Sequence, residues 1–433
     1  ISWNQYNRFP YDCFKWKGLD GSEIPVQVIT TPHASDATFT YNAGATAVEV
    51  KGAMVNFNQK KLGLDALMSY GWGDGGGGVD SEMIERLRRM EDFPACPQMP
   101  GIINEKSSDL MKRVLQKIDE LPCWDGELYL EYHRGTYTTQ GWLKRANRRN
   151  EINLHNAEWL GAIAGEGFIF DKETIDTCWE DLLLCQFHDI LPGSSVKGVY
   201  EEVMFLQDTI SQKTGEVIDA AIESIAADID TSDYKEPVVL FNTLSWDRTE
   251  AIKMPDGHWR DDIVVSAGGW CVVDASEKTN IENSISISDD CRQIESRFWK
   301  INLGDDGSII RLYDKKVDRE VLRDGQKANH WQLFEDRPLA EGHDAWDIDL
   351  HYQKYSFPDL ELESVKQIEH NSVRAVLELC WRLPVKEDAN QSVITQQMVI
   401  YANNPKIDFQ TQVDWFENHT LLKAAFAVDI RTN

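Results

Sequence analysis

The most regular pattern in the chain is a recurrence of apolar residues at three- and four-residue spacing between residues 141 and 235. This spacing places apolar side chains on one face of a helix. It predicts helices over residues 142–165, 172–190 and 196–229, separated by breaks that contain Gly, Asp or Pro. Three helices of this length with short connections predict an antiparallel three-helix bundle over residues 141–235.

The preceding part of the chain mixes short apolar runs with amphipathic segments and glycine-rich turns. Residues 26–30 and 128–132 are predicted strands, and residues 81–90 and 107–121 are predicted helices. Strands that alternate with helices are typical of an α/β domain, which keeps its functional polar residues just after its strands. We therefore expect an α/β domain over residues 1–140.

Beyond Pro237 the pattern changes to short runs of β-branched and aromatic residues. Residues 298–303 and 309–313 flank the turn Gly-Asp-Asp-Gly, which indicates a β-hairpin. Residues 407–415 alternate strictly between apolar and polar, which indicates a half-buried strand. Further predicted strands cover residues 238–241, 263–265, 270–273, 373–379 and 398–401. Residues 236–433 are thus predicted to form a β-sandwich, which makes the chain a multidomain protein with α/β, all-α and all-β parts.

The charge of the chain excludes some classes of partner. Its 433 residues include 44 basic and 72 acidic ones, for a net charge of −28. Nucleic acids and anionic membranes require a basic surface, so neither is an expected partner. No apolar run approaches the length that spans a membrane. A neutral substrate or a cation suits this surface better.

The cysteines indicate the redox compartment. The 8 cysteines are sparse and show no CxxC or other metal-binding spacing. They are predicted to be reduced thiols of an intracellular protein, not a disulfide framework. Two glycosylation sequons, at Asn390 and Asn418, would be used only in a secreted chain. We therefore expect a cytoplasmic location, with the vacuole or lysosome as the alternative.

The first candidate site is the pair His188 and Asp189, which follows an apolar helical stretch and precedes the helix-ending Pro192-Gly193. In the last helical turn, a side chain can leave the buried face and point at a site. A purely local interpretation is also open: a histidine near the negative end of the helix dipole, with Asp189 as its hydrogen-bond partner.

The second candidate is the loop of residues 71–78, in which only Trp72 and Asp74 are not glycine. It lacks the Lys-Ser/Thr that follows a phosphate-binding loop, and it is acidic. The loop is either a flexible surface segment or a mobile active-site loop. In the second case Asp74 would act as an acid or base beside a sugar-stacking Trp72.

A third cluster follows the predicted strand 128–132 and contains Glu131, His133, Arg134 and Tyr137. It is either a surface patch of ion pairs or a set of hydrogen-bonding groups for a polyhydroxylated ligand. The 15 tryptophans of the chain suit sugar stacking, although most are expected in the core.

Several ordered motifs resemble the α-mannosidases of glycoside hydrolase family 38, in particular their cytosolic and vacuolar branch. The resemblance spans nearly the whole chain, over residues 3–10, 71–78, 126–140, 185–194, 241–248, 344–349 and 413–423. It implies a retaining, exo-acting α-mannosidase that removes terminal α-D-mannose from oligosaccharides of N-glycan origin. The implied fold is a β/α barrel, of which residues 1–140 would be the C-terminal part, followed by a three-helix bundle and a β-sandwich.

The resemblance also assigns roles to residues of this sequence. His188 matches a late metal-ligating histidine, and Asp189 matches the neighbouring substrate-binding aspartate. Asp74 lies where the family carries its acid/base carboxylate. From their residue types, Trp72, His133, Arg134 and Tyr137 are expected to complete the sugar site. The implied cofactor is one divalent metal, zinc or alternatively cobalt. The broad surfaces of the sandwich predict a homo-oligomer.

The chain departs from the family in one respect. It contains neither the early His-x-Asp motif nor a segment for the nucleophilic aspartate. One His and one Asp cannot supply the roughly three protein ligands of a catalytic metal. We therefore expect a fragment that is inactive alone and needs the N-terminal part of the same enzyme. Two alternatives stay open: a metal-free glycosidase that uses Asp74 and Glu131, and a non-catalytic carbohydrate-binding protein.

Overall fold

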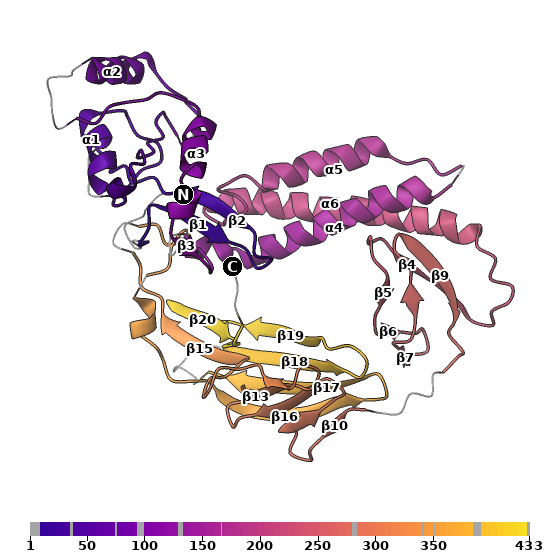
Figure 1. Cartoon of the computed structure of the whole chain (residues 1–433). Coiled ribbons are helices and arrows are strands. Elements are labelled where there is room, and N and C mark those ends of the chain that lie inside the picture. The colour runs from indigo at the N-terminus through magenta and orange to yellow at the C-terminus, as the bar shows by residue number, and fades with distance from the viewer. Residues whose placement is uncertain are drawn as a thin grey trace. The chain divides into compact units, whose positions relative to one another are not determined.

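The structure is a computed structural model that describes residues 9–34, 38–73, 76–92, 99–128, 133–165, 167–278, 284–339, 342–349, 351–383 and 391–430. The chain divides into two compact units, one of residues 1–133 with 430–433 and one of residues 134–429. Helices occur together with several separate sheets (Figure 1), which confirms the mixed helix-and-sheet fold. In the part of the chain that is described, no helix is long and apolar enough to cross a membrane.

The first unit contains a three-stranded sheet in the order β2-β1-β3, with β1 antiparallel to β2 and parallel to β3. The predicted helix at 81–90 is confirmed, whereas the one at 107–121 ends at Leu115 and gives way to a separate 3-10 turn. Most of the predicted strand 128–132 lies outside the described residues. The elements are β1 Cys13–Lys17, β2 Glu23–Gln27, α1 Ala47–Asn56, η1 Lys60–Leu62, α2 Ser81–Glu91, α3 Ser107–Leu115, η2 Ile118–Glu120 and β3 Cys123–Trp124.

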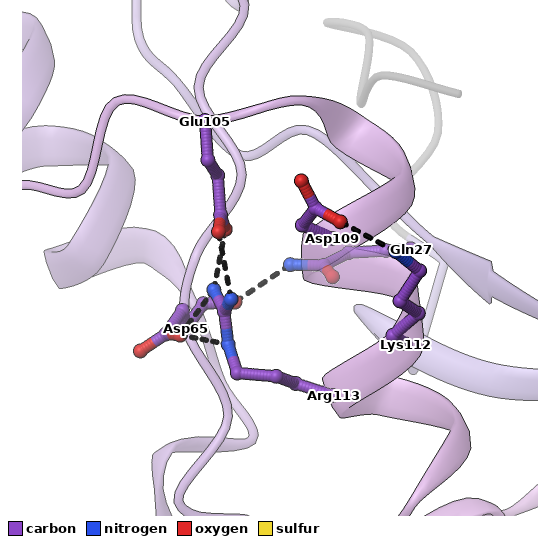
Figure 2. A network of polar contacts seen from close by, with 6 residues as sticks. All are labelled: Gln27, Asp65, Glu105, Asp109, Lys112 and Arg113. Carbon is purple, nitrogen blue, oxygen red and sulfur yellow. Dashed lines mark hydrogen bonds and ion pairs between the residues drawn. The ribbon is translucent and has the colours of Figure 1, made fainter.

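A guanidinium group fixes α3 in this unit (Figure 2). Arg113 donates to both carboxylate oxygens of Glu105, at 2.8 and 2.5 Å, and to Asp65 Oδ2 at 3.0 and 3.2 Å. The hydrogen bonds from Arg113 lower the pKa of Glu105. The carbonyl of Asp65 accepts a hydrogen bond from Gln27 Nε2 at 2.7 Å. Arg113 therefore links α3 to the segments that carry Glu105 and Asp65, and Asp65 in turn contacts the end of β2.

The second unit opens with η3 Arg134–Tyr137 and three long helices, α4 Gly141–Ile163, α5 Lys172–Cys185 and α6 Lys197–Ala227, which lie side by side in Figure 1. The N-terminal ends of α4 and α6 share one hydrophobic cluster with the last residue of α5. This cluster contains Leu143, Cys185, Tyr200 and Val203. The opposite ends of α4 and α6 share another, made of Leu160, Ala164, Ala221 and Ile225. Hence α4 and α6 run parallel, and α5 runs against both.

The rest of the second unit is built of strands. The predicted hairpin is confirmed, because β12 Trp299–Leu303 and β13 Ile309–Asp314 pair antiparallel. They belong to a five-stranded sheet, β10-β11-β12-β13-β14, which accompanies a four-stranded sheet, β16-β17-β18-β19, and a pair, β15-β20. The other bounds are β4 Pro237–Asn242, β5 Arg248–Thr249, β6 Ile252–Lys253, β7 Trp259–Arg260, β8 Val264–Val265, β9 Gly269–Asp274, β10 Ser286–Ile287, β11 Gln293–Glu295, β14 Arg319–Glu320, β15 His330–Glu335, η4 Tyr352–Lys354, β16 Glu361–His370, β17 Arg374–Arg382, β18 Val393–Tyr401, β19 Ile407–Asp414 and β20 Thr420–Ala425.

One large core joins these sheets. Alternate residues of β17 and β18 face it and are almost completely buried, namely Ala375, Leu377, Leu379, Trp381, Ile394, Met398 and Ile400. The opposite side comes from β11, β12, β13 and β15, including Ile301, Ile309 and Trp331. Trp381 is the largest fully buried side chain, and its ring meets that of Trp331 edge-to-face at 5.8 Å.

We expect Trp381→Phe to destabilise the protein by about 2–4 kcal/mol. The substitution leaves a cavity and removes the indole N–H that donates to the carbonyl of Asp306 at 2.7 Å. Urea denaturation measures the change. The matched control is Trp270→Phe, because Trp270 is 46% exposed and its replacement should cost less than about 0.5 kcal/mol. Equal effects of the two substitutions would contradict the assignment of Trp381 to the centre of the core.

Candidate functional site

The segment that carries His188 and Asp189 begins where α5 ends. The helix was expected to continue to residue 190, but it ends at Cys185, with Gln186 as its C-cap. A series of turns follows, in which Ile190 N and Leu191 N both donate to the carbonyl of Phe187, and Gly193 N donates to that of Ile190. The candidate pair therefore lies in a tight turn beyond the helix, not in its last turn.

His188 faces solvent beside a fixed carboxylate. Its side chain is 67% exposed, and its Nε2 lies 3.4 Å from Asp189 Oδ2. The other oxygen of Asp189 accepts a hydrogen bond from Ser194 Oγ at 2.9 Å. The carbonyl of Asp189 accepts a second one, from Ser195 Oγ at 2.8 Å. Two serines that follow the turn thus hold Asp189 in place and leave the imidazole accessible.

A partly buried lysine joins this turn to the one that follows η3. Lys144 Nζ donates to the carbonyl of Leu191 at 2.7 Å and also to the carbonyl of Thr139. Burial lowers the pKa of Lys144. Gly193 adopts a φ of 94°, and a Cβ there would lie only 2.6 Å from the Thr139 carbonyl oxygen. The two turns are therefore packed main chain against main chain.

Arg134 and Tyr137 lie on the η3 side of this junction. Tyr137 is 67% exposed, whereas the guanidinium of Arg134 lies over the ring of Tyr352, at 5.8 Å from its centroid. The hydroxyl of Tyr352 accepts a hydrogen bond from Lys423 Nζ at 2.6 Å. Burial favours the neutral phenol, but the hydrogen bond and the positive charges of Lys423 and Arg134 outweigh it, so the pKa of Tyr352 lies below its usual value.

The segment 343–349 is a third component that the sequence did not assign to the site. Thr136 N donates to the carbonyl of Trp346 at 3.3 Å, and Thr139 Oγ1 donates to that of Ala345 at 3.0 Å. A Cβ on Gly135 would lie 2.9 Å from the main chain of Trp346. Residues 344–349, rich in Asp and Trp, were noted in the sequence only because they resemble a family motif. Nothing in the sequence placed them near the other candidate residues.

The first unit holds the glycine-rich loop, which is partly described. Trp72 N donates to the carbonyl of Gly78 at 2.6 Å, which closes the loop. Trp72 Nε1 donates to Asp80 Oδ2 at 2.9 Å, and Asp80 also caps α2 by accepting from Met83 N. These hydrogen bonds, first that from Met83, lower the pKa of Asp80. The Trp72 side of the loop is therefore anchored, while the residue itself is 61% exposed.

The candidate site residues fall into three groups: those in the second unit, those in the first unit, and those outside the described residues. Arg134, Tyr137, His188 and Asp189 belong to the second unit, where Thr139, Lys144 and Gly193 join their two turns. Trp72 and His133 belong to the first unit, and His133 has a left-handed φ of 63°. Asp74 and Glu131 lie outside the described residues.

Among the residues that the structure describes, the donor set around His188 does not complete a metal site. Among the described residues, one group of three side chains could hold a metal ion, and it consists of Asp306, His330 and Asp359. That group does not include His188, which has Asp189 as its carboxylate neighbour. His188 can thus offer one ligand, fewer than the three that a catalytic zinc takes from protein.

Three protein-family models match successive parts of the chain. Residues 1–127 match the glycosyl hydrolases family 38 N-terminal domain, and residues 131–225 match the alpha mannosidase middle domain. Residues 272–433 match the glycosyl hydrolases family 38 C-terminal domain.

Curated relatives match the whole chain. It is similar to alpha-mannosidase of Saccharomyces cerevisiae, with 31% identity over 463 residues, and to alpha-mannosidase G of Dictyostelium discoideum, with 30% over 487 residues. It is 28% identical to human alpha-mannosidase 2C1 over 447 residues. Each alignment covers 100% of this chain but only 39%, 43% and 41% of these relatives, respectively.

A solved structure, that of an alpha-mannosidase from Enterococcus faecalis V583, shares the fold with a TM-score of 0.54. The match covers 95% of this chain and 57% of that one, at 16% sequence identity.

We expect Gly193→Ala to destabilise the protein by about 2–4 kcal/mol, because a Cβ needs both a different φ and a larger distance from Thr139. Chemical denaturation tests this. The control is Gly198→Ala in α6, where a Cβ would meet nothing within 4 Å and should be neutral or stabilise by up to about 1 kcal/mol. If Gly193→Ala behaves like the control, the close packing of the two turns is refuted.

Proposed function

Because the chain belongs to glycosyl hydrolase family 38, we propose that the protein of which it is part is a retaining α-mannosidase. Its substrates would be oligosaccharides of N-glycan origin, from which it removes terminal α-D-mannose. The observation that carries this proposal is the exposed His188 beside Asp189, whose carboxylate is held by Ser194. Such a pair presents hydrogen-bonding groups to a sugar without first having to order itself.

The residues of this chain would divide the binding of the sugar. Asp189 would accept hydrogen bonds from mannose hydroxyls through the oxygen that faces His188. Arg134 and Tyr137 lie on the adjoining turn and would add further hydrogen bonds, and His133 directly precedes them in the chain. Trp72 would offer its exposed ring to an apolar face of the sugar.

Retention of configuration requires two carboxyl groups about 5–5.5 Å apart. One forms a bond to the anomeric carbon as the leaving oxygen departs, and the other protonates that oxygen and later takes a proton from the attacking water. We propose Asp74 for the second role. The nucleophilic aspartate would come from residues beyond this sequence, as would the ligands that join His188.

We propose that His188 is one ligand of a divalent cation, zinc or cobalt, in the complete protein. Such a cation would bind mannose hydroxyls, orient the sugar ring and favour its distortion. The protein is proposed to act as a homo-oligomer in the cytoplasm, or in the vacuole or lysosome.

The first test combines metal analysis with hydrolysis of a chromogenic α-mannoside, on this chain and on a form extended at its N-terminus. We expect activity only in the extended form, together with one bound metal ion more than this chain holds alone. In that form His188→Ala should lower both by at least about 10-fold. The control His258→Gln changes a histidine that pairs with Asp256 and should change neither.

Other outcomes would favour a different function. Metal-independent hydrolysis by this chain alone would support a glycosidase that uses Asp74 and Glu131. Sugar binding without hydrolysis in both forms, retained after deletion of residues 1–235, would indicate a carbohydrate-binding protein. Either result contradicts the proposal.

A second test concerns the support of Asp189. In the extended form, Ser194→Ala should reduce kcat/KM by roughly 10-fold, because Asp189 loses a hydrogen bond to its carboxylate. Ser194→Thr keeps the hydroxyl and should retain most of the activity. Equal losses in the two variants would exclude a role for the hydroxyl.

A further inference from the structure

A cluster of metal-ligating side chains lies in the strand region, among residues that the proposed sugar site does not use. It consists of Asp306 in the β12–β13 turn, His330 at the start of β15, and Asp359 just before β16. One ligand atom from each lies within 4.8 Å of the other two. We propose that these three residues form a binding site for a divalent cation of the zinc class.

The distances between the ligand atoms suit such an ion. His330 Nε2 lies 3.3 Å from Asp359 Oδ2 and 4.0 Å from Asp306 Oδ2. Tetrahedral zinc, with bonds of about 2.0–2.2 Å, holds its ligand atoms about 3.4 Å apart. Small side-chain rotations therefore bring the three atoms onto one ion, with a fourth position left for water.

The histidine nitrogen itself needs a partner. His330 Nε2 is buried from solvent and has no hydrogen-bond partner among the described residues. It faces two carboxylate oxygens, which offer no proton when ionised. A cation bound between the three side chains would satisfy the nitrogen and both oxygens together.

Asp306 is oriented in advance. Its Oδ1 accepts hydrogen bonds from Ser308 N at 3.1 Å and Ser308 Oγ at 2.6 Å, which leaves Oδ2 directed at His330. Its carbonyl accepts the hydrogen bond from the buried Trp381. Asp306 is thus held by hydrogen bonds to Ser308 and to Trp381 in the core of the sheets. Metal sites use such outer contacts to fix the orientation of their ligands.

Lys327 competes for the same oxygen. Its ammonium lies 2.6 Å from Asp306 Oδ2, on a side chain that is 36% exposed. A metal ion would have to displace this cation, which can swing into solvent. The lysine therefore weakens the affinity of the site, and its removal should strengthen binding.

The donor set selects the class of ion and its role. One imidazole nitrogen and two carboxylate oxygens suit zinc, cobalt or manganese, whereas calcium and magnesium prefer oxygen alone. The three ligands come from the five-stranded sheet, the β15-β20 pair and the approach to the four-stranded sheet. An ion bound by these three residues would crosslink the three sheets and stabilise their packing.

The test uses this chain after treatment with a chelator, titrated with Co²⁺ and followed by visible absorption, with Zn²⁺ as competitor. Asp359→Asn is the main variant, because the Asp359 side chain is 58% exposed and its loss should not impair folding. His330→Gln is the second. His258→Gln is the matched control, and Lys327→Met tests the competition.

We expect one cation per chain, with affinity at least about 10-fold weaker in Asp359→Asn and His330→Gln. His258→Gln and His188→Ala should bind as the unchanged chain does, and Lys327→Met should bind several-fold more tightly. The proposal is overturned if the unchanged chain binds no Co²⁺, or if Asp359→Asn and His330→Gln bind as it does. Because the measurement involves no mannoside, its outcome is independent of the proposed hydrolase activity.

Discussion

The approach of Gly193 to the carbonyl of Thr139 is the contact on which the candidate site depends. No side chain fits between these two segments of main chain, so the turn that carries His188 cannot shift away from η3 without breaking the hydrogen bonds of Lys144 to both turns. The positions of the polar groups are therefore set by backbone packing together with the hydrogen bonds of Lys144. Such rigidity is what a binding site requires to avoid ordering itself when a ligand arrives.

The sequence predicted the elements with the clearest periodicity. The helix that starts at Ser81 and the hairpin around the turn before Ile309 were found because spacing and turn residues agreed. The strand β16 was missed, because its residues Glu361–His370 include four acidic or basic side chains and six of the ten residues are exposed. Strands β15 and β20 were missed for another reason: their partners lie far away along the chain, and no local pattern records such a pairing.

The candidate site likewise contains some residues that the local sequence predicted and others that it could not predict. The pair His188 and Asp189 could be found from residue types and the turn that follows them, but the end of α5 was placed five residues too late, since the apolar spacing continues past Cys185. Ser194 and Ser195, which support Asp189, follow it closely in the chain, but the more distant supporting residues could not be found from local sequence. Lys144 lies 47 positions before its partner Leu191, and Thr139 lies 206 positions before Ala345. Only the folded chain brings these groups together.

The carboxylate of Asp80 couples two parts of the first unit, because it accepts one hydrogen bond from each of them. It receives the indole N–H of Trp72 and also the main-chain N–H that begins α2. If Trp72 moved away, the side chain of Asp80 that caps the first turn of α2 would be less constrained. Conversely, fraying of that turn would loosen the indole ring of Trp72. Movement of Trp72 and melting of the first turn of α2 are therefore coupled, so that two small fluctuations behave as one cooperative opening.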